Sequence, residues 1–179
     1  MLTANRETAL RLLRRNPSTP GRVRRVAVPR DARMLTTLSQ VDYEDARVVE
    51  IGTAQDRTGE QWARAILEDA PGVMRAALRL GWLALGLQLG STRSDRLVLG
   101  WEVRRSTPDF VLLGAGSRLG MPAELLVKRR QQTLLFATFV QKENQIARAV
   151  WAGVEPVHQP VLRYVLDQTR RRSEHDAHV

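Results

Sequence analysis

The fold is decided by residues 109–142, DFVLLGAGSRLGMPAELLVKRRQQTLLFATFVQK. Strand-type runs rich in apolar residues occupy 109–119, 121–130 and 133–142, and a fourth, RLVLGWEVRR, precedes them at 96–105. At most three residues separate consecutive runs. Because parallel strands need a crossover of roughly a dozen residues, this spacing predicts an antiparallel meander.

Three glycines in this stretch raise the question of a phosphate-binding loop. Such a loop lies between a strand and a helix and has the spacing G-x-G-x-x-G. Here Gly114, Gly116 and Gly120 give G-x-G-x-x-x-G before another strand-type run. We therefore expect a strand, in which Gly114 and Gly116 lie in line with Leu112. On the inner face of a curved sheet, the missing side chains would leave room for a cavity.

Two helical patterns precede the meander. Residues 57–71 predict a helix in which Thr58 is the N-cap and Gln61 completes a capping box. Residues 72–90 predict a second helix, which is apolar on nearly all sides toward its end. That distribution indicates burial in the core, or contact with a lipid or a partner.

Strand patterns open the folded region. Residues 22–29 predict a short edge strand that ends at Pro29. Residues 41–52, VDYEDARVVEIG, alternate as a strand does, but Asp45 and Arg47 interrupt their apolar face.

A long helix with one broad apolar face is predicted over residues 143–173. Pro156 and Pro160 should kink it, or divide it into two helices near Gly153.

The chain is predicted to hold one folded domain, at residues 22–173. Residues 1–21 are interpreted as an appendage, with an amphipathic helix over 4–15 and a linker rich in proline and glycine. Residues 174–179 are interpreted as a flexible tail.

Composition narrows the class of protein. The 179 residues are 43% hydrophobic and 26% charged, with no cysteine and no apolar run long enough to span a membrane. Neither a secretory signal nor a disulfide is expected, so the cytoplasm is the expected location. The net charge is +9, but the basic residues are dispersed and nearly all arginine, so a nucleic-acid partner is not expected. The oligomeric state stays open, a homodimer included.

The order of elements resembles the START-like superfamily (SRPBCC, which includes polyketide cyclases and lipid-transfer proteins). The resemblance covers roughly residues 30–172, and W-A-G-x-x-P-V-H at 151–158 is similar to a branch from GC-rich bacteria. It implies an α+β, helix-grip fold: a curved antiparallel sheet wrapped around a long C-terminal helix, with two short helices after the first strand. It also implies a hydrophobic small-molecule ligand, such as a lipid or a polyketide, between the sheet and that helix.

The facing of the predicted elements gives a set of candidate ligand-binding residues. Arg118 is included because its guanidinium would anchor an acidic head group. The others are Tyr43, Trp101, Leu112, Gly114, Gly116, Met121, Leu125, Phe136, Thr138, Trp151 and His158.

Three functions remain open at this point. The first is a binding or carrier module without catalysis, and the second is a cofactor-free enzyme of the cyclase or dehydratase type. In the enzyme, His158, Tyr43 or Arg118 would polarise the substrate, with His158 as general acid or base. The third is an interaction protein without a ligand. No cofactor is expected, and His175-x-x-His178 has no further ligands that would make it a metal site.

Overall fold

A computed structural model describes residues 23–51, 57–92 and 94–176, with side chains described as far as residue 173. The predicted helix over 4–15 and its linker lie outside the described residues, as do the side chains of the two C-terminal histidines. The division of the chain at residues 22 and 173 therefore stays a prediction.

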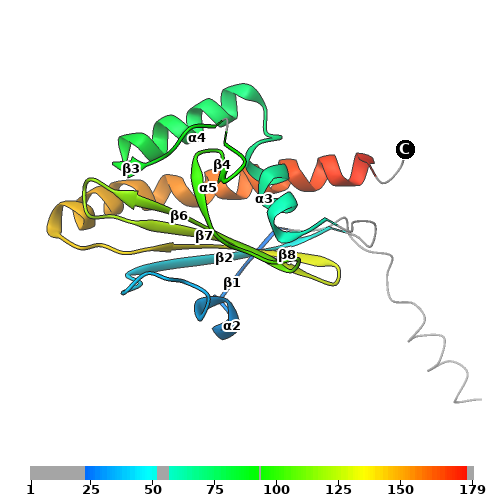
Figure 1. Cartoon of the computed structure of the whole chain (residues 1–179), viewed down its shortest axis with the longest axis horizontal. Coiled ribbons are helices and arrows are strands. Elements are labelled where there is room, and N and C mark those ends of the chain that lie inside the picture. The colour runs from blue at the N-terminus through cyan, green and yellow to red at the C-terminus, as the bar shows by residue number, and fades with distance from the viewer. Residues whose placement is uncertain (1–22, 52–56, 93, 177–179) are drawn as a thin grey trace, which may run out of the picture.

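The described chain folds as an open, curled antiparallel sheet of eight strands with a long C-terminal helix (Figure 1), so the α+β prediction is confirmed. The strand order is β1-β2-β8-β7-β6-β5-β4, and β3 pairs with β6. Helices α4 and α5 lie on one side of the sheet and α2 lies on the other (Figure 1). The elements are β1 Arg24–Val26, α2 Arg30–Arg33, β2 Tyr43–Glu50, α3 Gly59–Leu67, α4 Gly72–Ala84, β3 Leu87–Gln88, β4 Leu97–Val98, β5 Trp101–Ser106, β6 Phe110–Ser117, β7 Ala123–Arg130, β8 Thr133–Val140 and α5 Gln145–Asp176.

The predicted meander is present, with one difference at its start. Strands β6, β7 and β8 pair in succession, and β8 continues the sheet to β2. The run 96–105 is two strands rather than one, because Leu99 and Gly100 have φ angles of 48° and 95° and reverse the chain between β4 and β5. The three-glycine stretch belongs mainly to β6, which confirms the prediction of a strand.

The predicted start of α3 agrees with the structure, whereas the predicted end of α4 does not. The predicted capping box is present: Gln61 N donates to Thr58 Oγ1 at 3.2 Å, and Thr58 N donates to Gln61 Oε1 at 2.8 Å. The second helix was expected to reach residue 90 but ends at Ala84, since Gly86 has φ 76° and the chain then forms β3.

Helix α5 is a single helix, so of the two predicted alternatives the division into two helices near Gly153 does not occur. Both Pro156 and Pro160 lie inside it, on exposed positions. A carbonyl that loses its partner to proline can be solvated at such a position, which is why the helix continues through both. Asn144 caps its start by accepting a 2.8 Å hydrogen bond from Ala147 N.

Each face of the sheet carries its own apolar cluster. The main core lies on the helix side, where Val111, Leu113 and Ala115 of β6 point. A smaller cluster lies on the α2 side and contains Leu112 and Phe110. The inner-face placement of Leu112 was therefore wrong. Among the described residues, no helix combines the length and hydrophobicity of a membrane span.

The glycines of β6 make room for polar side chains rather than for a cavity. A Cβ on Gly114 would overlap the guanidinium of Arg104, which lies across the outer face. A Cβ on Gly116 would come within 2.9 Å of Gln88 Oε1, on strand β3, which pairs antiparallel with β6 there. The expectation that both glycines open the inner face is corrected accordingly.

Candidate functional site

A buried ion pair interrupts the helix-facing side of β2. Asp45 and Arg47 are both buried, although they lie near the edge of the sheet. Arg47 Nε lies 3.6 Å from Asp45 Oδ2, and Arg25 of the edge strand β1 donates from Nε to Asp45 Oδ1 at 2.7 Å. A buried carboxylate is stable only with such cationic partners.

Helix α5 covers this ion pair through Gln159. The side-chain oxygen of Gln159 accepts a hydrogen bond from Arg47, whose Nη2 also lies 3.4 Å from the Gln159 carbonyl oxygen. The Gln159 amide nitrogen donates to the hydroxyl of Tyr43. One glutamine therefore connects both Tyr43 and Arg47 of β2 to the helix.

Three rings pack beside this network. Trp151 and His158 are seven residues apart on α5 and so share one face of the helix. The Tyr43 ring lies 4.6 Å from the Trp151 ring and 6.0 Å from the His158 ring, measured between centroids. Trp151 and His158 are 5.5 Å apart.

Several buried polar atoms here have no hydrogen-bond partner among the described residues. They are Asp45 Oδ2, Arg47 Nε, Thr138 Oγ1, Trp151 Nε1 and His158 Nε2. Thr138 belongs to this place because it is the cross-strand neighbour of Asp45. An unpaired buried polar atom costs about 1–3 kcal/mol, so a group that supplies the missing hydrogen bonds would be bound favourably. We call this set the polar cluster: Tyr43, Asp45, Arg47, Thr138, Trp151, His158 and Gln159.

The protonation states within the polar cluster suit hydrogen bonding to a neutral group. Burial lowers the pKa of His158, an effect that outweighs the nearby Asp45 carboxylate. Burial, together with Asp45, raises the pKa of Tyr43 to about 12. At neutral pH His158 is therefore an uncharged imidazole, which can accept or donate a proton, and Tyr43 keeps its hydroxyl proton.

The structure brings four of the predicted site residues together, namely Tyr43, Thr138, Trp151 and His158. Arg118 is exposed at the end of β6 and lies outside the polar cluster. Leu112 and Gly114 lie on the other face of the sheet, and Gly116 pairs with Gln88 of β3. The remaining four pack in the main core: Trp101, Met121, Leu125 and Phe136.

Sequence reasoning missed Asp45, Arg47 and Gln159 as parts of the site. The signal for the first two was present, because they break an otherwise apolar alternation on β2. A charge at an inward position of a strand indicates a buried partner as readily as an exposed edge. For Gln159 no pattern in the sequence singles it out among the polar residues of α5.

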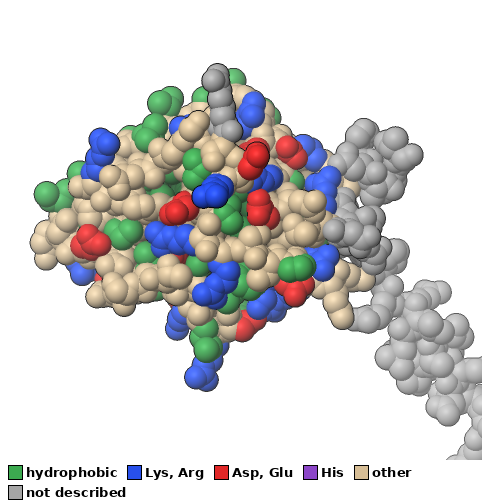
Figure 2. Space-filling model, viewed as in Figure 1, with side chains coloured by type: hydrophobic (Ala, Val, Ile, Leu, Met, Phe, Trp, Pro, Cys, Tyr) green, Lys and Arg blue, Asp and Glu red, His purple; other side chains and the backbone are tan. Residues whose placement is uncertain are grey.

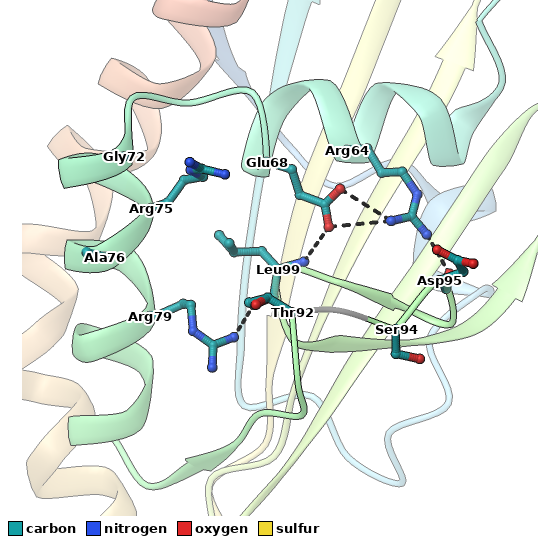
Figure 3. Close-up of a pocket in the computed structure, with 10 residues that line it drawn as sticks. All are labelled: Arg64, Glu68, Gly72, Arg75, Ala76, Arg79, Thr92, Ser94, Asp95 and Leu99. Atoms are coloured by element: carbon teal, nitrogen blue, oxygen red, sulfur yellow. Dashed lines mark hydrogen bonds and ion pairs between the residues drawn. The ribbon is translucent and has the colours of Figure 1, made fainter.

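A second feature is a surface hollow of about 480 Å³ between α3, α4 and the segment before β4 (Figure 3). Arg75 and Arg79 extend into it from α4, and the Glu68–Arg64 ion pair of α3 lies opposite (Figure 3). Among the described residues, no three histidine or acidic side chains are grouped as a metal site would need.

Comparison with known proteins gives a family without an assigned activity. Searches of curated proteins and of solved structures found no match. The START-like resemblance accordingly holds for the antiparallel sheet and the C-terminal helix, while the superfamily stays a prediction. A family model matches residues 37–165, a range that includes β2, the meander and most of α5. The chain thus belongs to the family described as "Protein of unknown function (DUF2867)".

Proposed function

We propose that the protein binds a hydrophobic small molecule at the polar cluster, between the sheet and α5. The observation that carries this proposal is that five buried polar atoms without a hydrogen-bond partner among the described residues converge on one place, beside three packed rings. Binding sites for small molecules combine apolar walls with a few polar groups that fix orientation. The polar cluster has both components.

The chemistry of the cluster defines the class of ligand. The indole N–H of Trp151 is only a donor, whereas the Thr138 hydroxyl and the neutral His158 can donate or accept. A carbonyl or hydroxyl group on the ligand would satisfy these atoms, and the apolar or aromatic body would pack on Tyr43 and Trp151. We therefore propose a largely apolar molecule with at least one carbonyl or hydroxyl group, as in a polyketide or an oxidised lipid.

The edge of the sheet offers a route to the cluster. A surface hollow of about 440 Å³ at this edge is lined by Arg25, the segment 26–28, Asp45 and, from the α2 side, Arg33 and Glu44. Arg25 is mostly exposed, so its movement would uncover the carboxylate it covers.

Native mass spectrometry of gently purified protein tests this proposal. A reproducible adduct that denaturation releases as an apolar molecule would support it. Tyr43→Phe and His158→Asn should lower the occupancy of the adduct severalfold. The matched control is Tyr164→Phe on the exposed side of α5, which should leave it unchanged. An adduct that Tyr43→Phe and Tyr164→Phe affect equally would place the ligand elsewhere and refute the proposal.

A cofactor-free enzyme of the cyclase or dehydratase type is the second candidate. It is favoured by a neutral imidazole and a protonated phenol on neighbouring rings, an arrangement suited to general acid–base catalysis. Incubation of the released ligand with fresh protein would then give a product of changed mass. His158→Asn should abolish that product and retain measurable binding, whereas a pure carrier would return the ligand unchanged.

A further inference from the structure

Helix α4 is an apolar helix with no buried residue. Its sequence, GVMRAALRLGWLA, contains two arginines as its only charged residues. A helix that is apolar on nearly all sides normally lies inside a core or against a partner. In this protein α4 lies at the outside of the helical layer, farther from the sheet than α5 (Figure 1).

One side of α4 holds it to the protein. Met74, Leu78 and Trp82 are partly buried against the main core. The Trp82 ring meets the ring of Trp101 edge to face, with centroids 5.3 Å apart. These contacts hold α4 to the protein. They involve only the side of the helix that carries Met74, Leu78 and Trp82, which follow one another at intervals of four residues.

The other side of α4 is apolar and exposed. Val73, Leu80 and Leu83 have exposed fractions of 85%, 66% and 47%. Ala76, Ala77 and Ala84 are exposed as well. Hydrophobic side chains accordingly gather along the upper rim of the space-filling view, over α4 (Figure 2). A continuous exposed apolar surface of this kind marks an interaction site.

Two arginines lie beside this surface, on the side of α4 that faces the hollow between α3 and α4 (Figure 3). Arg75 is exposed, and its guanidinium has no partner among the described residues. Arg79 donates only to main-chain oxygens, to Leu99 at 3.1 Å and to Gly90 at 3.4 Å. Glu68, on α3 across the hollow, is already engaged by Arg64 and by the Leu99 N–H (Figure 3).

We propose that α4 docks on an anionic phospholipid surface, with its exposed apolar side in the headgroup region and Arg75 on lipid phosphates. A helix with an apolar side and basic residues beside it is typical of helices that lie in a membrane interface. At 13 residues α4 is too short to span the bilayer, so it would lie in the plane of the interface.

Charge complementarity favours a lipid surface over a second copy of the chain. In a two-fold symmetric dimer the same patch meets itself. Helix α4 contributes no carboxylate that could pair with the free guanidinium of Arg75 in such a contact. An anionic bilayer supplies the missing negative charge, which is worth roughly 1 kcal/mol for each basic residue near the surface. The proposal does not depend on the polar cluster, which lies against α5.

Vesicle co-sedimentation of the full chain tests the proposal. The probes are phosphatidylcholine vesicles with and without phosphatidylglycerol. The test variants are Arg75→Glu and the double variant Leu80→Ser/Leu83→Ser. The matched controls are Arg30→Glu and Met34→Ser, which change an exposed arginine and a 76% exposed methionine at α2, on the opposite side of the sheet.

We expect the wild-type protein to sediment with the anionic vesicles and not with the neutral ones. Each test variant should lower the partition coefficient by about tenfold or more, and each control by less than about twofold. Residues 1–22 are identical in the wild type and in all variants. Vesicle binding through that segment would therefore give the same partition coefficient for the test variants and the controls. Because the altered side chains are exposed, thermal unfolding should be unchanged. Should the double variant be less stable, Arg75→Glu still decides the test, since Arg75 has no partner to lose.

Three results would overturn the proposal. The first is no sedimentation of the wild-type protein with anionic vesicles. The second is equal loss in the test variants and the controls at α2. The third is a wild-type dimer in size-exclusion chromatography that Leu80→Ser/Leu83→Ser dissociates, since the apolar side would then contact a second copy.

Discussion

Replacing Gly114 by alanine tests how the outer face of the sheet is held. The added Cβ would overlap the guanidinium of Arg104, which must then leave the outer face. Arg104 would then lose its ion pair with Glu124, whose carboxylate is completely buried. It would also lose the 2.9 Å hydrogen bond that it donates to Thr37 Oγ1. Glu124 would retain donors from Thr36 and Thr37, so only part of its stabilisation is lost.

The magnitude follows from these contacts. Removing a partner from a buried ion pair costs about 3–5 kcal/mol, and the remaining donors to Glu124 and the partial exposure of Arg104 reduce this to about 2–3 kcal/mol. The lower conformational entropy of unfolded alanine returns about 0.4–1 kcal/mol. A net loss of about 2 kcal/mol corresponds to a fall in Tm of roughly 4–8 °C for a chain of this size.

Thermal and urea unfolding of two glycine variants provide the measurement. Gly153→Ala in α5 is the matched control, because a Cβ there meets nothing within 4 Å and alanine favours a helix interior. It should stabilise the protein by about 0.5–1 kcal/mol, so the two variants should shift Tm in opposite directions. In an Arg104→Ala background, Gly114→Ala should cost almost nothing further. The reasoning is refuted if Gly114→Ala is as stable as the wild type. It is also refuted if Gly114→Ala lowers stability equally in the presence and absence of the Arg104 side chain, because the missing Cβ would then not be needed to accommodate that side chain.

Three further predictions concern single side chains. Because burial lowers the pKa of His158, the unfolded chain takes up this proton first. Stability should therefore fall as pH drops below about 6.5, and His158→Asn should flatten the change in urea midpoint between about pH 7.5 and 5.5. The pKa of Tyr43 is raised to about 12, so its contribution is present below about pH 10 and is lost as pH rises toward 12. Tyr43→Phe should remove that alkaline loss in a pH series of melting curves, and an unchanged slope would contradict it. Thr58→Ala removes the capping-box acceptor of α3 and should cost about 1 kcal/mol in urea unfolding; a loss near zero would mean that packing alone holds the start of this helix.

The sequence predicted the parts of the fold that local physics determines. Short connections allow only antiparallel pairing, which is why the meander was predictable. The capping box at Thr58 was predictable because its two hydrogen bonds form within four residues. The break at Leu99 and Gly100 was missed because β-type alternation continues through both residues, and only the backbone angles reveal the turn.

The candidate site was less predictable because the face of a strand is a tertiary property. Alternation placed Leu112 and Gly114 on one face but did not say which face meets α5. The two faces of β6 are both apolar, so hydrophobicity did not discriminate between them. Conversely, Asp45 and Arg47 are polar residues at inward positions of β2. They could be identified as parts of a candidate site only once the position of α5 over them was known.

The two buried carboxylates show why one place is structural and the other is a candidate site. Glu124 lies on the outer face, where Thr36, Thr37 and Arg104 provide hydrogen bonds to both of its oxygens. Asp45 has cations on both sides, yet its Oδ2 accepts no hydrogen bond among the described residues. The rings on α5 beside it leave further polar atoms unpaired. A saturated carboxylate fixes a loop to the sheet, whereas an unsaturated group between apolar rings retains binding capacity. The same kind of charge therefore stabilises the fold on one face, and on the other it lies where we propose that a ligand binds.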